Sequence, residues 1–211
     1  PRTRPVQGVE TVDMVILPSA YMGSVSYFAH LLREDCVIDT GEHFIKRSQR
    51  NRAVILSANG PLPLTVNVEH ANTPRRPMRD VRIDYSKRWQ HQHWVSIVSA
   101  YRSAPYFDYY AQRIEPFYRR QWRYLLDYNM EYTEALLQML GVSRPLRVSD
   151  VYVEAAAGDI DLRPRHNEGP AEAAEPYIQV FADRMPFVAD LSVLDLILCE
   201  GPAAIDVVSG H

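Results

Sequence analysis

The chain has 211 residues, of which 46% are hydrophobic and 23% charged, and its formal charge is −3. This composition is ordinary for a globular protein with one full core, and the weak net charge does not favour duplex nucleic acid or an anionic membrane as partner. Two cysteines, Cys36 and Cys199, are too few for a disulfide scaffold and indicate a cytoplasmic protein. No apolar run approaches the ~20 residues of a membrane span, and no signal-peptide pattern is present.

The first third of the chain predicts mainly strands. Short apolar runs, the first of them stopped by Pro18, predict strands at 12–17, 36–38, 53–56 and 62–68. Apolar residues at helical spacing predict one helix at 24–33. The Asn59-Gly60 dipeptide between the last two strands is typical of a hairpin turn.

Helical spacing dominates residues 86–141. It predicts a helix around Trp94–Tyr101, a second that begins at Pro105, and a longer one from Trp122 that ends at Gly141. Later segments predict strands at 148–154 and 177–181, an exposed loop at 163–176 and a last helix at 192–199. The predicted fold is α+β in a single domain, 1–211, with a mixed or antiparallel sheet from both ends of the chain packed against the helical subregion.

The densest polar cluster is the run Lys46-Arg47-Ser48-Gln49-Arg50-Asn51-Arg52 between two predicted strands. Lysine, arginine and asparagine together can bind a carboxylate or a phosphate, and a lysine beside a hydroxyl can activate it as a nucleophile. The alternative is a solvated basic turn that deters edge-to-edge aggregation.

Other polar residues have both a functional and a structural interpretation. His93 shares a helical face with Trp89, as an acid–base group or as a core histidine. Asp161 and Arg163 alternate at a strand end, as a substrate clamp or as an internal ion pair. Ser192-x-x-Asp195 fits a helix capping box.

The chain contains thirteen tyrosines and three tryptophans, many of them between Trp89 and Tyr132. This density is typical of a polar-lined cavity, of an interface, or of a core whose edges are in contact with water. A binding or assembly protein that uses a Tyr/Trp-rich helical surface is therefore the alternative to an enzyme. It predicts that Trp89, Tyr106 and Tyr110 form an exposed patch.

The ordered set of these short motifs resembles the WbqC-like family. The segments that carry the resemblance are Ala20-Tyr21 to Tyr27-Phe28, Lys46-Arg47-Ser48, Asn51-Arg52, Leu64-Thr65-Val66, Trp89 with His93, Asp161-Leu162-Arg163, Tyr177-Ile178-Gln179-Val180-Phe181 and Leu191 to Leu196. The family's His-Gln-Pro-x-Tyr opening is replaced here by Leu17-Pro18-Ser19-Ala20-Tyr21, as in a shorter branch without that motif. His43 and His93 are the candidates to replace the missing histidine.

The resemblance implies a bacterial acyl or aminoacyl transferase, possibly a glycine transferase, acting on a carbohydrate or amino-bearing precursor, as in O-antigen biosynthesis. Its expected catalytic residues are Lys46, Ser48 and His93. Its expected substrate-binding residues are Tyr21, Asn51, Arg52, Asp161, Arg163 and Gln179. We expect a small or sugar-linked anionic substrate, with no metal, no cofactor, no nucleic acid and no membrane span, and the oligomeric state stays open.

Overall fold

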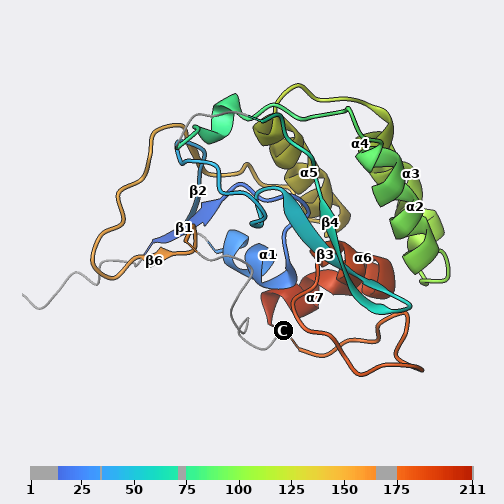
Figure 1. The fold of residues 1–211 in the computed structure, drawn as a ribbon. Helices are drawn as coiled ribbons and strands as arrows, with labels where there is room; N and C mark the ends of the chain where they lie inside the picture. The colour runs from blue at the N-terminus through green and yellow to red at the C-terminus, as the bar shows by residue number, and fades with distance from the viewer. Residues whose placement is uncertain (1–13, 34, 71–74, 165–174, 211) are drawn as a thin grey trace, which may run out of the picture.

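Two short apolar runs form the centre of a parallel sheet in the computed structural model, which describes residues 14–33, 35–70, 75–164 and 175–210. Both runs are buried along their whole length, as expected of parallel strands covered on both faces. The sheet has the order β5-β2-β1-β6, and all of its pairs are parallel (Figure 1). Its strands are β1 (Val15–Pro18), β2 (Cys36–Asp39), β5 (Val148–Ser149) and β6 (Ile160–Asp161).

A separate antiparallel hairpin follows β2. Its strands are β3 (Arg52–Ser57) and β4 (Gly60–Thr65), with Ser57 paired to Gly60. The turn therefore consists of residues 58–59, one residue earlier than the Asn59-Gly60 pattern predicts, and Gly60 supplies the positive φ of +102°. The α+β class is confirmed, with parallel and antiparallel pairs in two different sheets.

Helices cover the sheet and the hairpin, and none that the described residues form is long and apolar enough to cross a bilayer. The helices are α1 (Val25–Leu31), α2 (Trp89–Tyr101), α3 (Phe107–Ile114), α4 (Pro116–Arg119), α5 (Leu125–Met139), α6 (Val193–Glu200) and α7 (Ala204–Ser209), with 3-10 turns η1 (Met78–Asp80) and η2 (Gly201–Ala203). Residues 193–199 of α6 are all buried, because this helix packs against α1, α3, α5 and β3.

Several predicted boundaries are wrong. Residues 177–181 form no strand, because both amide atoms of Gln179 bond to the backbone of Val188 and fold the segment into a compact turn. The strand predicted at 148–154 has only two paired residues. Pro105 lies two residues before α3 begins, and α4 and α7 were not predicted. Most of the loop predicted at 163–176 lies outside the described residues.

Most aromatic residues of the helical region belong to the core, although Tyr109 is exposed. Trp89, Tyr101, Tyr128 and Tyr132 are at most 2% exposed, and the rings of Phe117 and Tyr132 stack with centroids 4.2 Å apart. The exposed patch expected of an assembly protein is therefore wrong for Trp89 and for Tyr110, both of which are buried. The tyrosine density serves internal packing.

The turn after β2 predicts a steric test of the fold. A Cβ on Gly41 would lie 2.2 Å from the backbone nitrogen of Tyr152, so Gly41→Ala must displace the segment after β5. We expect the free energy of unfolding, measured by urea denaturation, to fall by about 1–3 kcal/mol, as for other overpacking substitutions. An unchanged denaturation midpoint would show that this close contact is not present.

Candidate functional site

The order of the parallel strands defines where a ligand is expected. From β1 the chain moves to β2 and then β5 on one side, and it returns to place β6 on the other side of β1. Ligands of open parallel sheets bind in the crevice outside the carboxyl ends of the strands where such a reversal occurs. Here that edge carries the residues that follow β1, beginning with Ser19, and those that follow β6, ending in Arg163.

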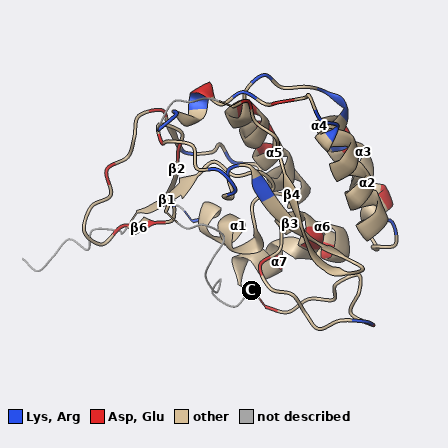
Figure 2. Ribbon diagram, viewed as in Figure 1, with Lys and Arg blue, Asp and Glu red and all other residues tan. Residues whose placement is uncertain are grey.

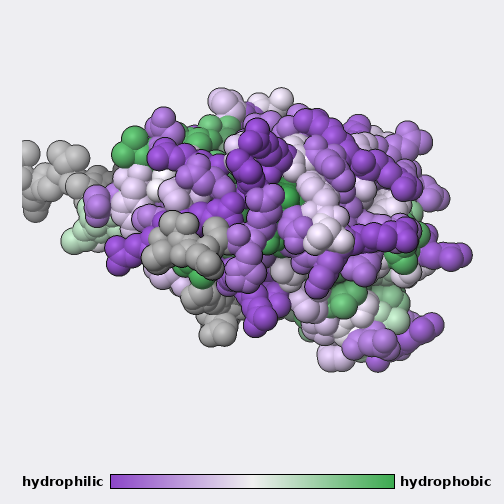
Figure 3. All heavy atoms as spheres, turned by 45° about the horizontal axis from the view of Figure 1, so that its top comes forward, coloured by the Kyte–Doolittle hydropathy of each residue, from purple (hydrophilic) through white to green (hydrophobic). Residues whose placement is uncertain are grey.

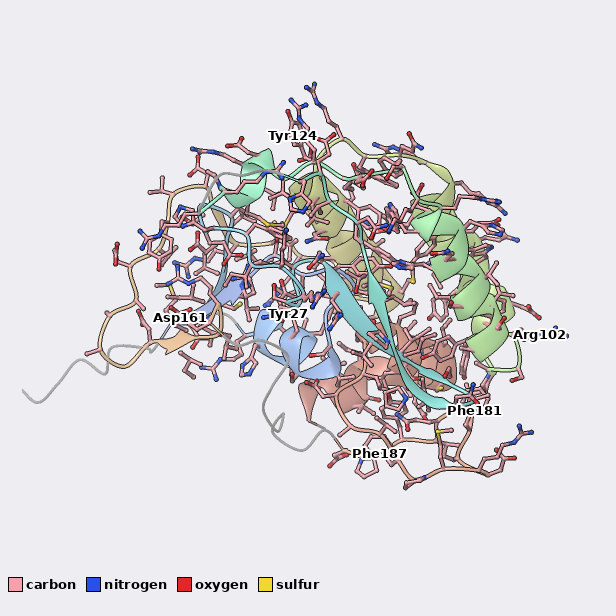
Figure 4. The ribbon with its side chains drawn as sticks, in the orientation of Figure 1. Tyr27, Arg102, Tyr124, Asp161, Phe181 and Phe187 are labelled. Atoms are coloured by element: carbon pink, nitrogen blue, oxygen red, sulfur yellow. The ribbon has the colours of Figure 1, made fainter. Side chains whose placement is uncertain are left out.

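One buried arginine joins three segments at this edge. Arg163 is 5% exposed and donates from Nε and Nη2 to the Asp161 carboxylate, at 2.9 and 2.7 Å. Its Nη1 bonds to Asp39 at the end of β2 and to the Val153 carbonyl at 2.7 Å. Its guanidinium also lies over the ring of Tyr152. Asp161, on β6 in Figure 4, and Arg163 thus form the internal ion pair that was one of the two sequence interpretations.

A second buried arginine pairs with a carboxylate beside the first. Arg50 and Glu42 are 1% and 2% exposed, and Arg50 donates hydrogen bonds from Nε and Nη2 to the two oxygens of the Glu42 carboxylate. Nη2 also donates to the Arg163 carbonyl at 3.0 Å, which links the two arginine clusters. Burial raises the pKa of the Glu42 carboxyl to about 7, although Arg50 acts to lower it. Sequence reasoning included Arg50 in the polar run but did not single it out, and it missed Glu42.

Two of the expected site residues hold the loop between β2 and β3 in shape. The hydroxyl of Ser48, which is fully buried, donates to the Ile45 carbonyl at 2.7 Å. The Asn51 side chain accepts from the Arg47 backbone and donates to the Val66 carbonyl, both at 3.0 Å. These contacts use the polar atoms internally and position the loop.

The helix α5 braces the same loop from the other side. Asn129 Nδ2 donates to the Arg50 carbonyl at 2.8 Å and lies 3.5 Å from the Ser19 hydroxyl. Its Oδ1 is buried and has no hydrogen-bond partner among the described residues.

Tyr27 of α1, labelled in Figure 4, donates to the Pro18 carbonyl at 2.9 Å and fixes the end of β1.

A pocket of about 90 Å³ opens beside this framework. Its wall is built from the turn after β1, the loop and start of β3, and the segment before α6; its polar members are Tyr21, Ser24, Gln49, Arg52, Asp190 and Ser192. Arg52 is half-buried, and its Nε donates to Thr65 Oγ1 at 3.1 Å. Its two terminal nitrogens have no hydrogen-bond partner in the part of the chain that the structure describes. Asp190 is bound through both oxygens to Ser26.

His93 does not line this pocket, but it is hydrogen-bonded to Tyr21, which does. The Tyr21 hydroxyl lies 2.9 Å from His93 Nδ1 and 3.0 Å from the Tyr118 hydroxyl. Burial lowers the pKa of the His93 imidazole to about 4, against a smaller opposing effect of the Thr65 carbonyl. His93 is therefore neutral at pH 7.

The remaining expected site residues lie elsewhere. Lys46 is exposed and makes no ion pair with any described residue. Gln179 is bonded to Val188 and lies 3.3 Å from Asp195. Of the expected site residues, Tyr21 and Arg52 therefore line one pocket, and His93 is hydrogen-bonded to Tyr21. Four others form hydrogen bonds within the protein that support the edge of the sheet: Ser48, Asn51, Asp161 and Arg163.

The capping box predicted at the start of α6 is only half present. The Ser192 hydroxyl does accept from the Leu194 backbone, but the Ser192 backbone nitrogen donates to the Val54 carbonyl. Asp195 instead accepts the hydroxyls of Tyr101 and Tyr177, at 2.7 and 2.6 Å. The buried Asp195 carboxylate therefore connects α6 to α2, through Tyr101, and to the segment that contains Tyr177.

These features define an α+β protein with a small pocket, lined by one arginine, at the carboxyl edge of a small parallel sheet. The model of the WbqC-like protein family matches residues 19–163, so the chain belongs to this family. The match begins at Ser19 and ends at Arg163, and it includes both arginine clusters and Arg52. No curated protein and no solved structure gives a significant match. No group of acidic, histidine or cysteine side chains among the described residues is placed to hold a metal ion.

The buried imidazole predicts a pH dependence of stability. The pKa of His93 is about 4 in the folded protein and about 6.5 in an unfolded chain, so between these values the unfolded state binds more protons. Stability due to His93 is therefore present above pH 6.5 and lost as the pH falls towards 4. Over this range we expect the stability difference between wild type and His93→Gln to shrink by about 3 kcal/mol, in urea denaturation.

Glu42 acts in the opposite direction, because its raised pKa favours the folded state at low pH. Its contribution is common to both proteins and cancels in the comparison. Parallel stability curves for wild type and His93→Gln would contradict the burial of an uncharged imidazole.

Proposed function

We propose that the protein is an acyl or aminoacyl transferase that binds the carboxylate or phosphate of its substrate at Arg52. The observation that carries this proposal is the pocket at the carboxyl edge of β1, which is lined by Arg52, whose two terminal guanidinium nitrogens form no hydrogen bond with any described residue. The transferase chemistry rests on the resemblance to proteins associated with polysaccharide precursors.

The setting of Arg52 favours an oxyanion with two acceptor atoms. A guanidinium offers parallel N–H donors that match a carboxylate or a phosphate, and the bond from Nε to Thr65 leaves the terminal nitrogens to form that fork. Half-burial reduces competition from water. Gln49 and the hydroxyls of Ser24 and Ser192 add neutral hydrogen-bonding groups to the same wall.

The size of the pocket limits what enters it. A volume of about 90 Å³ suits a small acid or a single phosphate group, and a whole sugar nucleotide is far larger. We therefore assign to the pocket the anionic end of the donor, with the rest of the substrate outside it. The exposed Lys46, which lies in the preceding loop, stays a candidate for contact with that outer part.

Proton movement in this proposal involves Tyr21 and His93 as a pair. Acyl transfer requires that the attacking amine or hydroxyl lose a proton as the new bond to the acyl carbon forms and the leaving group departs. Tyr21 lines the pocket and is hydrogen-bonded to the neutral imidazole of His93. Because burial disfavours the protonated imidazole, the pair holds the proton only transiently and passes it on to the departing leaving group. His93 then acts through Tyr21 and does not itself contact substrate.

Arg52→Gln tests the proposal. Loss of charge-assisted hydrogen bonds worth about 1.5–3 kcal/mol predicts a 10- to 100-fold rise in KM for the anionic donor. The assay is turnover of a panel of activated amino acids with sugar-nucleotide acceptors. Arg47→Gln is the matched control, since it removes an exposed cation that lies one residue before Ser48 and does not line the pocket, and it should leave KM unchanged.

Lys46→Ala is measured in the same assay, and unchanged turnover would remove Lys46 from the mechanism. Wild-type kinetics in Arg52→Gln would contradict anion binding at this pocket. Absence of any transfer across the panel, with intact ligand binding at Arg52, would contradict the transferase chemistry alone.

A further inference from the structure

Positive charge is concentrated in two segments that lie far from the pocket in sequence. Residues 75–88 and 119–124, here called the basic face, contain nine lysines and arginines and only two carboxylates. The rest of the chain then holds 14 basic and 24 acidic residues, so the net charge of −3 conceals a strong asymmetry. Figure 2 shows the basic residues along the upper edge, between η1 and α4.

Backbone contacts hold the two segments side by side. Arg82 and Tyr124 form an antiparallel bridge, and the Ile83 backbone nitrogen donates to the Arg123 carbonyl at 3.1 Å. The Tyr85 hydroxyl donates to the Trp122 carbonyl at 3.0 Å, and it accepts from the Trp122 backbone nitrogen at 2.9 Å. The basic face is therefore a single fixed surface.

Most of these cations have no internal counter-charge. Arg119 and Arg120 pair with Glu115 and Glu131, and the Arg76 guanidinium bonds to backbone carbonyls. Six other basic residues of the face are exposed and form no ion pair with any described residue: Arg75, Arg79, Arg82, Lys87, Arg88 and Arg123. Like charges this close destabilise the free protein, so an external anionic partner would relieve their repulsion.

The chemistry of the face favours an anionic lipid surface over a nucleic acid. Proteins that bind single-stranded nucleic acids combine a basic groove with open aromatic rings on which the bases stack. Here Trp122 is buried between Phe117 and the Arg120 guanidinium, and the Arg123 guanidinium lies over Tyr124. Figure 3, which brings this side forward, shows a mainly hydrophilic surface. None of the exposed large hydrophobic residues found in the described chain belongs to the face.

We propose that the basic face docks the protein electrostatically on a bilayer that carries anionic phospholipid headgroups. Arginine matches the phosphate groups of such lipids, and the lack of exposed large apolar side chains on the face indicates contact with headgroups without insertion. This surface is distinct from the pocket at Arg52, and its test does not depend on the transferase proposal.

The test is co-sedimentation of the whole chain with phosphatidylcholine vesicles, with or without phosphatidylglycerol. We expect binding only to the anionic vesicles, with release by added salt. Each basic residue near an anionic surface contributes about fivefold to binding. The triple variant Lys87→Gln, Arg88→Gln, Arg123→Gln is therefore expected to bind about a hundredfold more weakly.

The matched control removes three exposed cations elsewhere: Arg102→Gln, Arg147→Gln and Arg184→Gln. Arg102 lies at the opposite end of α2 from Arg88 and is labelled in Figure 4, well apart from Tyr124. This control should bind almost as wild type, and neither triple variant should have a lower thermal midpoint than wild type. Equal losses in both triple variants, equal binding to neutral vesicles, or tight binding of a polynucleotide in place of vesicles would each overturn the proposal.

Discussion

Two buried arginines, each paired with carboxylates, hold together the carboxyl edge of the sheet. Arg50 pairs with Glu42, Arg163 pairs with Asp39 and Asp161, and Arg50 reaches across to the Arg163 carbonyl. Removing charges from water costs several kcal/mol each, and removing one partner of such a pair costs about 3–5 kcal/mol. Their value here is geometric, because they define the relative positions of β2, β6 and the loop before β3.

The buried ion pairs matter because the carboxyl edge of the sheet has little regular secondary structure of its own. The parallel strands are two to four residues long, and the segments after them carry backbone groups that no ladder satisfies. The arginine side chains and Asn129 bind several of these carbonyls. The first residue after the braced loop is Arg52, so the same contacts that stabilise the fold also fix the wall of the pocket. A site built on such a support needs little rearrangement to bind an oxyanion.

The sequence predicts the elements that follow one periodic rule and misses those set by distant contacts. Continuous apolar runs identified β1 and β2, and the spacing of leucines identified α5. The 177–181 segment has the same apolar character as a strand, but the long-range bond between Gln179 and Val188 decides its shape. Glu42 gave no signal, because its role depends on meeting Arg50 across an irregular loop. The basic face was likewise hidden by a net charge averaged over the whole chain.

Amide hydrogen exchange in Glu42→Gln tests most directly whether the arginine pairs hold the site. We expect faster exchange, by about tenfold or more, at the Tyr21 amide, which donates to the Gln49 carbonyl, and at the Arg52 amide, which donates to the Ser48 carbonyl. The amides of α6, which lie in the core away from this network, should keep their protection. Unchanged protection at Tyr21 and Arg52, or an equal loss throughout α6, would contradict the claim that the buried ion pairs position the pocket.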